Sequence, residues 1–329
     1  MPSIRVLFLS AASLLGGALA ADVSGSAVTY ALANNCSQGG CRMPSFDRGY
    51  FFQLDLSGNN PPNGITVFDP KGGLAYHINV TAPDGSPGDL AATAAADTDG
   101  TVLLPISYSG IGHFKGGIVE LNQYGKQVRF IDTGRFLPEA ACFAPDHSIW
   151  VMGKRGDGKL VQKYSSDGKL IGSFLPRSLF PPGLPPAGTG IGWIRASRDR
   201  IGMMVYPGQV SNNPEWIELD LEGNLMGQWK LGPRFTADPV THNMTFSLGS
   251  FAFTSDGRLF AQATTCPALY HCSSQLVLLD RDSSTWKAAG NNPIDSHHQL
   301  LAADRNDLVL WDRSQSNTGG VQLQWVLPQ

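Results

Sequence analysis

The chain has 329 residues, of which only 16% are charged, and it contains 38 glycines and 22 prolines. Its net charge is −3 and it has no stripe of Lys and Arg, so nucleic acid is a poor candidate partner. Many turn-forming residues with few charges are typical of a protein built from short strands and tight turns. The length alone suggests two domains, but closed repeat folds of this size form single units.

Residues 1–20 have the features of a signal peptide. Arg5 gives a positive start, Val6 to Leu19 is an apolar and small-residue run, and Ala18-Leu19-Ala20 is an A-x-A cleavage site. The apolar run is too short for a comfortable membrane span, and no later stretch qualifies. We therefore expect a secreted or periplasmic protein without a membrane span, in which residues 21–329 form one domain.

Two kinds of strand pair alternate along the chain, each with a spacing of roughly 43 to 60 residues. The inner kind joins two apolar strands through a tight turn, and it is predicted near residues 90–104, 140–152, 190–206, 248–262 and 298–311. The outer kind follows it, and is predicted near residues 65–80, 118–131, 160–174, 216–229 and 276–287. Four strands per unit at this period predict a β-propeller.

Lone strands are predicted at both ends of the repeats, at residues 27–32, 50–56 and 321–327. We expect the N-terminal strand to complete the last blade, since this removes an exposed sheet edge. The prediction is an all-β propeller of six four-stranded antiparallel blades, closed by strands from both termini, with seven blades as the alternative. The tight Asp, Asn, Ser and Gly turns, among them the turn at residues 97–100, define one face of the ring, called the short-turn face below.

Four of the five cysteines form two closely spaced pairs in loop-like stretches. Cys36 is near Cys41, and Cys266 is near Cys272. An exported chain meets an oxidising compartment, so we predict two disulfides, Cys36–Cys41 and Cys266–Cys272. Metal ligation with His271 is the competing interpretation of the second pair. Cys142 lies in an apolar strand and is predicted to be a buried free thiol.

The repeats resemble those of NHL-type and gluconolactonase-like six-bladed propellers over about residues 65–329. The resemblance rests on the Asp-Gly turns of the inner pairs and on Val161-Gln-Lys-Tyr-Ser-Ser-Asp-Gly-Lys-Leu-Ile171 in an outer pair. It implies the fold and no single activity, because such propellers include lyases, lactonases, dehydrogenases and binding scaffolds. Gluconolactonase-like enzymes hold a divalent metal through Glu, Asn and Asp, and no S-E-G-P opening or clear metal segment matches theirs here.

The long connections gather on the other face, called the long-loop face below. They are residues 107–117, 176–190, 207–214, 232–246, 264–274 and 290–297. Long loops on one face of a rigid scaffold are where binding sites are usually built. A ligand site is therefore predicted at the mouth of the central channel, and it draws on Glu139, Trp193, His242, His297 and His298. Trp193 and Arg195 should lie on one side of their strand.

The leading functional hypothesis is a monomeric binding propeller whose long-loop face takes a small molecule, a glycan or a protein. No catalytic residue and no metal ligand is assigned. The alternative is a propeller enzyme, a lyase or lactone hydrolase, with a divalent cation at the channel mouth. A purely structural envelope protein is a third hypothesis, and it rests only on the lack of catalytic motifs such as G-x-S-x-G and H-E-x-x-H.

Overall fold

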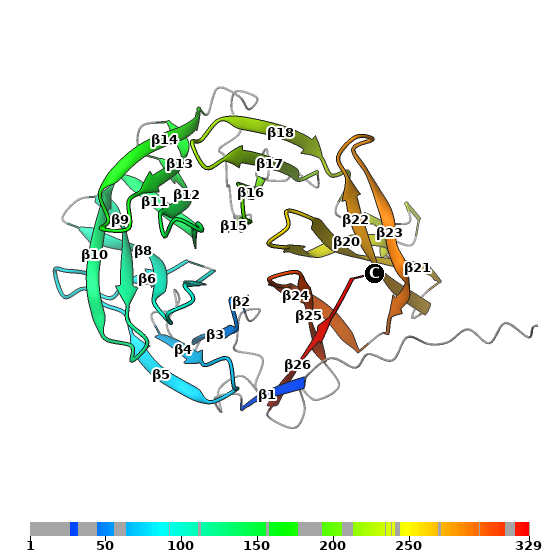
Figure 1. Ribbon diagram of the computed structural model, residues 1–329, viewed down its shortest axis with the longest axis horizontal. Helices are drawn as coiled ribbons and strands as arrows, with labels where there is room; N and C mark the ends of the chain where they lie inside the picture. Colours follow the sequence, from blue (N-terminus) through cyan, green and yellow to red (C-terminus); the bar gives the residue numbers. More distant parts are fainter. Residues whose placement is uncertain are drawn as a thin grey trace, which may run out of the picture.

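The computed structural model describes residues 27–31, 45–55, 64–91, 93–110, 113–155, 158–176, 193–205, 213–233, 235–237, 239–240, 244–268, 271–295, 297–312 and 320–328. Within these ranges, 26 strands form six antiparallel sheets around a central axis (Figure 1). The protein is a six-bladed propeller, as predicted, and the alternative of seven blades is wrong. None of the described residues belongs to a helix that is long and apolar enough to cross a membrane.

The strands follow the blades in chain order. Blade 1 contains β2 (Ser45–Asp47), β3 (Tyr50–Asp55), β4 (Gly64–Phe68) and β5 (Leu74–Asn79). Blade 2 contains β6 (Asp89–Leu90), β7 (Ala95–Ala96), β8 (Val102–Gly110), β9 (His113–Leu121) and β10 (Gln127–Gly134). Blade 3 contains β11 (Phe136–Phe143), β12 (Ile149–Arg155), β13 (Lys159–Tyr164) and β14 (Leu170–Pro176).

The remaining three blades follow in the same way. Blade 4 contains β15 (Trp193–Ala196), β16 (Arg200–Val205), β17 (Glu215–Asp220) and β18 (Leu225–Lys230). Blade 5 contains β19 (Phe235–Ala237), β20 (Met244–Phe253), β21 (Leu259–Ala268), β22 (His271–Asp280) and β23 (Thr285–Ile294). Blade 6 contains β24 (His298–Asp304), β25 (Asp307–Asp312), β26 (Gly320–Val326) and β1 (Ala27–Ala31).

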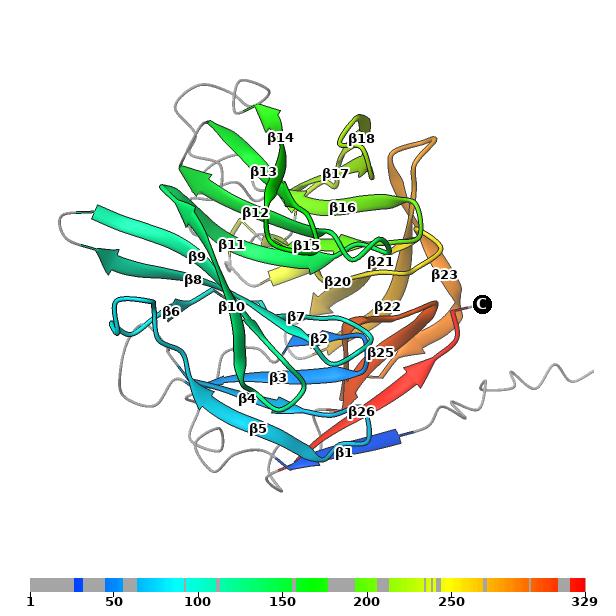
Figure 2. The same ribbon diagram turned by 60° about the vertical axis from the view of Figure 1, so that its left-hand side comes forward.

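Strands from the two ends of the chain close the ring, as predicted. β1 pairs antiparallel with β26, with Tyr30 opposite Val321, and the two strands lie side by side in Figure 2. The ring of Tyr30 is fully buried and stacks on Phe51 of blade 1, with 4.9 Å between ring centroids. The segment near residues 50–56 differs from the prediction of a lone strand. It forms β3, which pairs with β2 and β4 in a complete first blade.

Hydrophobic clusters fill the interfaces between neighbouring blades in the described part of the chain. One lies between blades 1 and 2, one between blades 3 and 4, and others at the remaining four interfaces. The third strand of blade 1, β4, is buried along its whole length. The outermost strands face solvent on one side, and β18 accordingly has no fully buried residue.

Polar contacts join successive blades on the short-turn face. Arg48 of blade 1 pairs with Asp97 of blade 2, and Asp97 accepts a hydrogen bond from Nδ1 of His147 of blade 3 at 2.6 Å. Blades 4, 5 and 6 are linked through the main chain of Ser255, whose carbonyl accepts from Arg198 N at 2.9 Å and whose N–H donates to Arg305 O at 2.7 Å. The short turns therefore hold neighbouring blades together, in addition to the apolar clusters.

Candidate ligand-binding site

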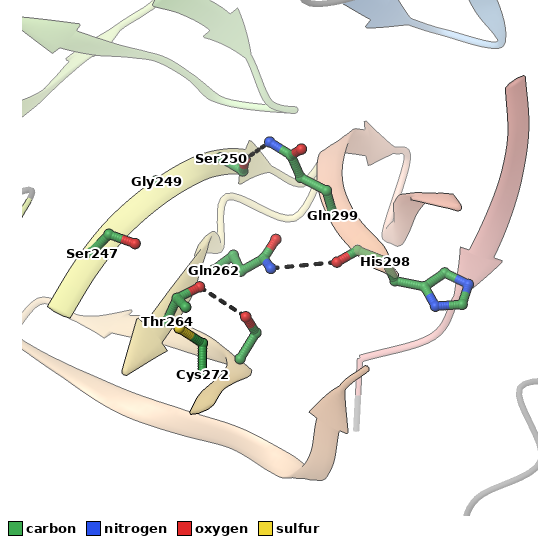
Figure 3. A pocket seen from close by; sticks show the side chains of 9 residues that line it. Ser247, Gly249, Ser250, Gln262, Thr264, Cys272, His298 and Gln299 are labelled. Carbon is green, nitrogen blue, oxygen red and sulfur yellow. Dashed lines mark hydrogen bonds between the residues drawn. The ribbon is translucent and has the colours of Figure 1, made fainter. Parts of the chain in front are cut away.

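A cavity of about 300 Å³ lies between blades 5 and 6, in the half of the ring that faces the long loops (Figure 3). Nine residues line it: Ser247, Gly249, Ser250, Gln262, Thr264, Cys272, Ser274, His298 and Gln299. Seven of them come from β20, β21 and β22 of blade 5, and two from the start of β24 of blade 6. None of the nine is Asp, Glu, Lys or Arg, so the lining is polar and carries no fixed charge.

The strand register of blade 5 places the polar groups side by side. Ser247 lies opposite Thr264, and Thr264 lies opposite Ser274. The hydroxyl groups of Thr264 and Ser274 are 2.8 Å apart and share a hydrogen bond. Because residues two apart on a strand face the same way, Gly249 and Gln262 form the next rung of the same face. One face of this sheet is thus hydroxyl- and amide-rich near the long loops.

The same face becomes apolar toward the short turns. Phe260, two residues before Gln262, is buried there with Ala252 and Leu300. The polar rungs are therefore a local replacement of the apolar contacts that fill the rest of the interface between blades 5 and 6. Polar side chains with small volumes leave a space where larger apolar side chains would close it.

A β-bulge in β20 places a further hydroxyl at the cavity. The pairing of β20 with β21 shifts between Gly249 and Phe251, so Ser250 is the extra residue. Ser250 has a φ of +52°, a left-handed conformation that is uncommon for residues other than Gly. Its hydroxyl accepts a hydrogen bond from Nε2 of Gln299 at 2.9 Å, across the boundary between the blades.

Gln262 holds the start of blade 6 against blade 5. Its Oε1 accepts a hydrogen bond from Leu300 N at 2.8 Å, and its Nε2 lies 3.4 Å from the carbonyl oxygen of His298. These two contacts fix the orientation of the amide, because oxygen and nitrogen each have one matching partner. The second hydrogen of Nε2 and the second lone pair of Oε1 remain for a molecule in the cavity.

His298 lines the cavity with its main chain, and its ring is held elsewhere. Nδ1 lies 2.8 Å from Oδ1 of Asp295, and Figure 3 shows the imidazole directed away from the hydroxyl groups. Burial alone would raise the pKa of Asp295, but hydrogen bonds from the His298 ring and from the His297 and His298 amides lower it. Nε2 of His298 is buried and has no hydrogen-bond partner among the described residues.

Glu139 was predicted at the channel mouth, and it is the extra residue of a bulge in β11. The pairing of β11 with β12 shifts between Pro138 and Ala140. One carboxylate oxygen lies 2.6 Å from Nζ of Lys154, and the other is buried without a hydrogen-bond partner. Burial raises the pKa of Glu139 although Lys154 opposes the shift. This carboxyl belongs to blade 3 and does not border the cavity between blades 5 and 6.

Trp193 begins β15 and packs within blade 4. Its ring centroid lies 5.5 Å from that of Trp216, and the guanidinium of Arg195 lies 5.6 Å from the Trp193 ring. Trp193 and Arg195 therefore share one side of the strand, as predicted. Arg195 is buried and donates to the carbonyl oxygen of its neighbour Ile194 at 2.9 Å.

The other predicted residues have mixed outcomes. His297 is exposed and does not line the cavity. His242, together with Cys36 and Cys41, lies outside the described residues. Cys266 and Cys272 form a disulfide, as predicted, so the metal-ligation interpretation of this pair is wrong. Cys142 is a buried free thiol, also as predicted, and burial raises its pKa to about 12.

Of the four predicted ligand-binding residues that the structure describes, only His298 borders the cavity. Sequence reasoning missed Ser247, Ser250, Gln262, Thr264 and Gln299, because single Ser, Thr and Gln residues match no motif. A signal for two of them, Gln262 and Thr264, was present in the alternation of the strands. With Ser274, which also lines the cavity, they occupy positions of the blade 5 face that Phe260 and Leu276 continue as apolar.

Among the described residues, no group of three or more His, Cys, Asp or Glu side chains converges in a way that could hold a metal ion. The divalent cation of the alternative hypothesis therefore has no ligand set within these ranges. The orphan oxygen of Glu139 is a single carboxylate beside an ammonium group, which repels a cation.

Comparisons with known proteins support the fold and nothing more specific. No protein-family model matches the chain, and no curated protein matches its sequence. Among solved structures, a member of the DUF4221 family from Bacteroides vulgatus is 10% identical with a TM-score of 0.51, and the match covers 91% of this chain and 96% of that one. A luciferin-regenerating enzyme is 8% identical with a TM-score of 0.46, and the match covers 92% and 95% of the two chains. The likeness at these identities is one of architecture.

Proposed function

We propose that this protein is a secreted or periplasmic binding propeller that takes a small polar molecule in the cavity between blades 5 and 6. One observation carries the proposal. The polar residues that line the cavity interrupt an otherwise apolar interface, and some of their hydrogen-bonding groups, such as Oε1 of Gln299, make no hydrogen bond to the described residues. A concave site with a few fixed polar groups is the usual form of a small-molecule site. Export is proposed from residues 1–20 alone.

The site is held in shape before any ligand arrives. The Cys266–Cys272 disulfide joins the ends of β21 and β22 beside the cavity. Gln262 and Gln299 fix the two blades relative to each other through hydrogen bonds. A site that is already ordered loses little conformational entropy on binding, which favours affinity for a small ligand.

The repeats themselves are proposed to be of the NHL or gluconolactonase-like type. The outer pair from Val161 to Ile171 supports this, because it forms β13 and β14 around a turn with Gly168 at a φ of +84°. The proposal concerns the ancestry of the blades and assigns no reaction.

Gly249 offers a direct test of the binding site. A Cβ atom added there meets no atom within 4 Å, and the residue has no positive φ, so the backbone tolerates a side chain. We expect the Gly249→Leu variant to fold normally and to fill the cavity. Ligand-observed NMR with a library of small polar compounds should then give hits with the wild type that the variant loses.

The Asp167→Ala variant, in an exposed turn of the short-turn face, is the matched control and should keep those hits. Hits that persist in Gly249→Leu would place binding elsewhere, and the proposal would fail. If the proposal holds, Gly249→Leu should weaken binding at least tenfold, about 1.4 kcal/mol, and Asp167→Ala should leave it unchanged.

The enzyme alternative is favoured by one observation, the buried carboxyl of Glu139 with its raised pKa. Such a group is suited to general acid or base catalysis. A lyase or lactone hydrolase should contain tight, stoichiometric metal after purification, and Glu139→Gln should abolish turnover of a lactone. If the purified protein instead binds a ligand, retains no metal and shows no lactone turnover in either the wild type or Glu139→Gln, it is a binding protein.

A further inference from the structure

We propose that the cavity between blades 5 and 6 selects a neutral polyhydroxylated ligand, a sugar or polyol about one ring in size. The inference rests on the proposed function, because it names the ligand class of that same cavity. It depends on three properties of the lining: its lack of charge, its unused hydrogen-bonding groups and the volume that it encloses.

The lack of charge disfavours ions. A carboxylate or ammonium group that entered the cavity would lose its hydration and find no opposite charge among the nine lining residues. Asp295 and the His298 ring are already engaged with each other through a hydrogen bond, and the ring points away from the hydroxyl groups (Figure 3). Acids and amines should therefore bind more weakly than neutral molecules of the same shape.

The unused polar groups disfavour apolar ligands. Among the described residues, the Ser247 side chain makes no hydrogen bond, and Gln299 uses only Nε2, so that its Oε1 accepts nothing there. An apolar molecule would cover these groups and leave them unpaired, at a cost of about 1–3 kcal/mol each. A ligand with several hydroxyl groups instead offers both donors and acceptors, which is what serine, threonine and glutamine side chains match.

The volume limits the size of the ligand. A space of about 300 Å³ is at the small end of ligand sites, so it suits a single ring and not a chain of several. Gly249 contributes to this space, since a side chain there would project into it. The rung formed by Gly249 and Gln262 thus provides room and a fixed amide next to each other.

The experiment compares matched probes on the full-length protein by isothermal titration calorimetry. The probes are glucose and myo-inositol, their charged counterparts glucuronate and glucosamine, and cyclohexanol as an apolar ring. The variants are Gly249→Leu and Gln299→Leu, with Gln228→Leu as the control on an exposed outer strand. We expect a neutral probe to bind the wild type at least tenfold more tightly than its charged counterpart. That binding should weaken at least tenfold in the two cavity variants and not in the control.

The outcomes separate the ligand class from the site. If glucuronate, glucosamine or cyclohexanol binds best and loses affinity in Gly249→Leu, the cavity is the site and the ligand class is wrong. If glucose or inositol binds equally well in Gly249→Leu, the cavity is not its site, and the inference fails. If no probe binds, the inference is overturned, and the library screen with Gly249→Leu decides the proposed function on its own.

Discussion

Gln299 of blade 6 donates a hydrogen bond from Nε2 to the hydroxyl oxygen of Ser250 in blade 5, at 2.9 Å. The acceptor belongs to a bulge residue whose φ is +52°. A non-glycine residue in this conformation stores strain of about 1–3 kcal/mol, and such strain concentrates at binding sites. The hydrogen bond thus joins two blades at a strained residue that lines the cavity.

The strain at Ser250 can be measured with two variants. Ser250→Gly and Ser250→Ala both remove the hydroxyl group, but only glycine adopts a positive φ without a steric penalty. We expect the glycine variant to be more stable than the alanine variant by about 1 kcal/mol. Urea unfolding measures the difference, and equal midpoints in the two variants would show that the backbone is unstrained there.

Ring closure should depend on the ring of Tyr30 and not on its hydroxyl group. Tyr30 is fully buried, and its hydroxyl has no hydrogen-bond partner in the structure. Tyr30→Ala should lower the free energy of unfolding by about 3–5 kcal/mol, because it empties the interface between β1 and blade 1. Tyr30→Phe keeps the stacking on Phe51 and should be as stable as the wild type. A large loss in the phenylalanine variant would contradict this assignment.

Glu218 should be essential for the contact between blades 4 and 5. Its carboxylate is fully buried, accepts from Nε1 of Trp216 at 2.7 Å, and pairs with Arg200 and Arg281. Glu218→Gln removes the counter-charge of Arg281 and leaves Arg200 paired with Asp199 alone, so we expect a loss of about 3 kcal/mol in urea unfolding. Glu222→Gln, in an exposed turn, is the control and should change stability little. An unchanged free energy of unfolding in Glu218→Gln would mean that this carboxylate charge is not needed at the contact.

The contact between His147 and Asp97 should make stability depend on pH. The hydrogen bond and charge of Asp97 raise the pKa of His147 in the folded protein. The protonated ring is thus favoured by folding, and its stabilisation is complete below the unfolded pKa near 6.5 and lost as the pH rises through the folded value. Burial alone would raise the pKa of Asp97, but hydrogen bonds from His147 and Thr98 lower it, so Asp97 stays ionised over the pH range in which His147 titrates.

The test compares the wild type with His147→Asn, which also tolerates the φ of +59° at this position. We expect the stability advantage of the wild type in urea unfolding to be greater at pH 5.5 than at pH 9. An advantage that stays constant or grows with pH would exclude a protonated histidine in this contact.

The cysteines should differ in reactivity. Peptide mapping without reduction is expected to recover a fragment bridged by Cys266 and Cys272. Cys142 should resist iodoacetamide at pH 8 until denaturant is added, because it is buried and its thiol pKa is raised to about 12. Rapid alkylation of Cys142 in the native protein would be inconsistent with its place in β11.

The fold could be predicted because the same strand–turn–strand pattern recurs in successive blades. Turns such as the one ending in Gly100, at a φ of +87°, recur between apolar strands at a regular spacing, so each repeat supports the assignment of the others. Blade 1 was harder to recognise because its inner strand β2 is only three residues long. A short strand with little apolar periodicity gives a weak signal, so Tyr50–Asp55 looked like a lone strand.

The candidate site could not be predicted in the same way. Gln262 and Gln299 are 37 positions apart and belong to different blades, and only the packing of these blades brings both to one cavity. The bulge at Ser250 depends on pairing with β21, which local propensity does not reveal. Sequence reasoning favoured histidines because their side chains can act as acids, bases and metal ligands, whereas the cavity is lined mainly by Ser, Thr and Gln.

The closure of blade 6 has a consequence for the order of events during synthesis. Among the described strands, β1 is synthesised first and its partner β26 last. Until then β1 has unpaired backbone groups, and the faces of blade 1 with Phe46, Phe51 and Phe68 lack their cover. We expect the nascent chain to carry an open arc of blades until β26 pairs with β1, so truncation within β26 should leave an open, aggregation-prone ring.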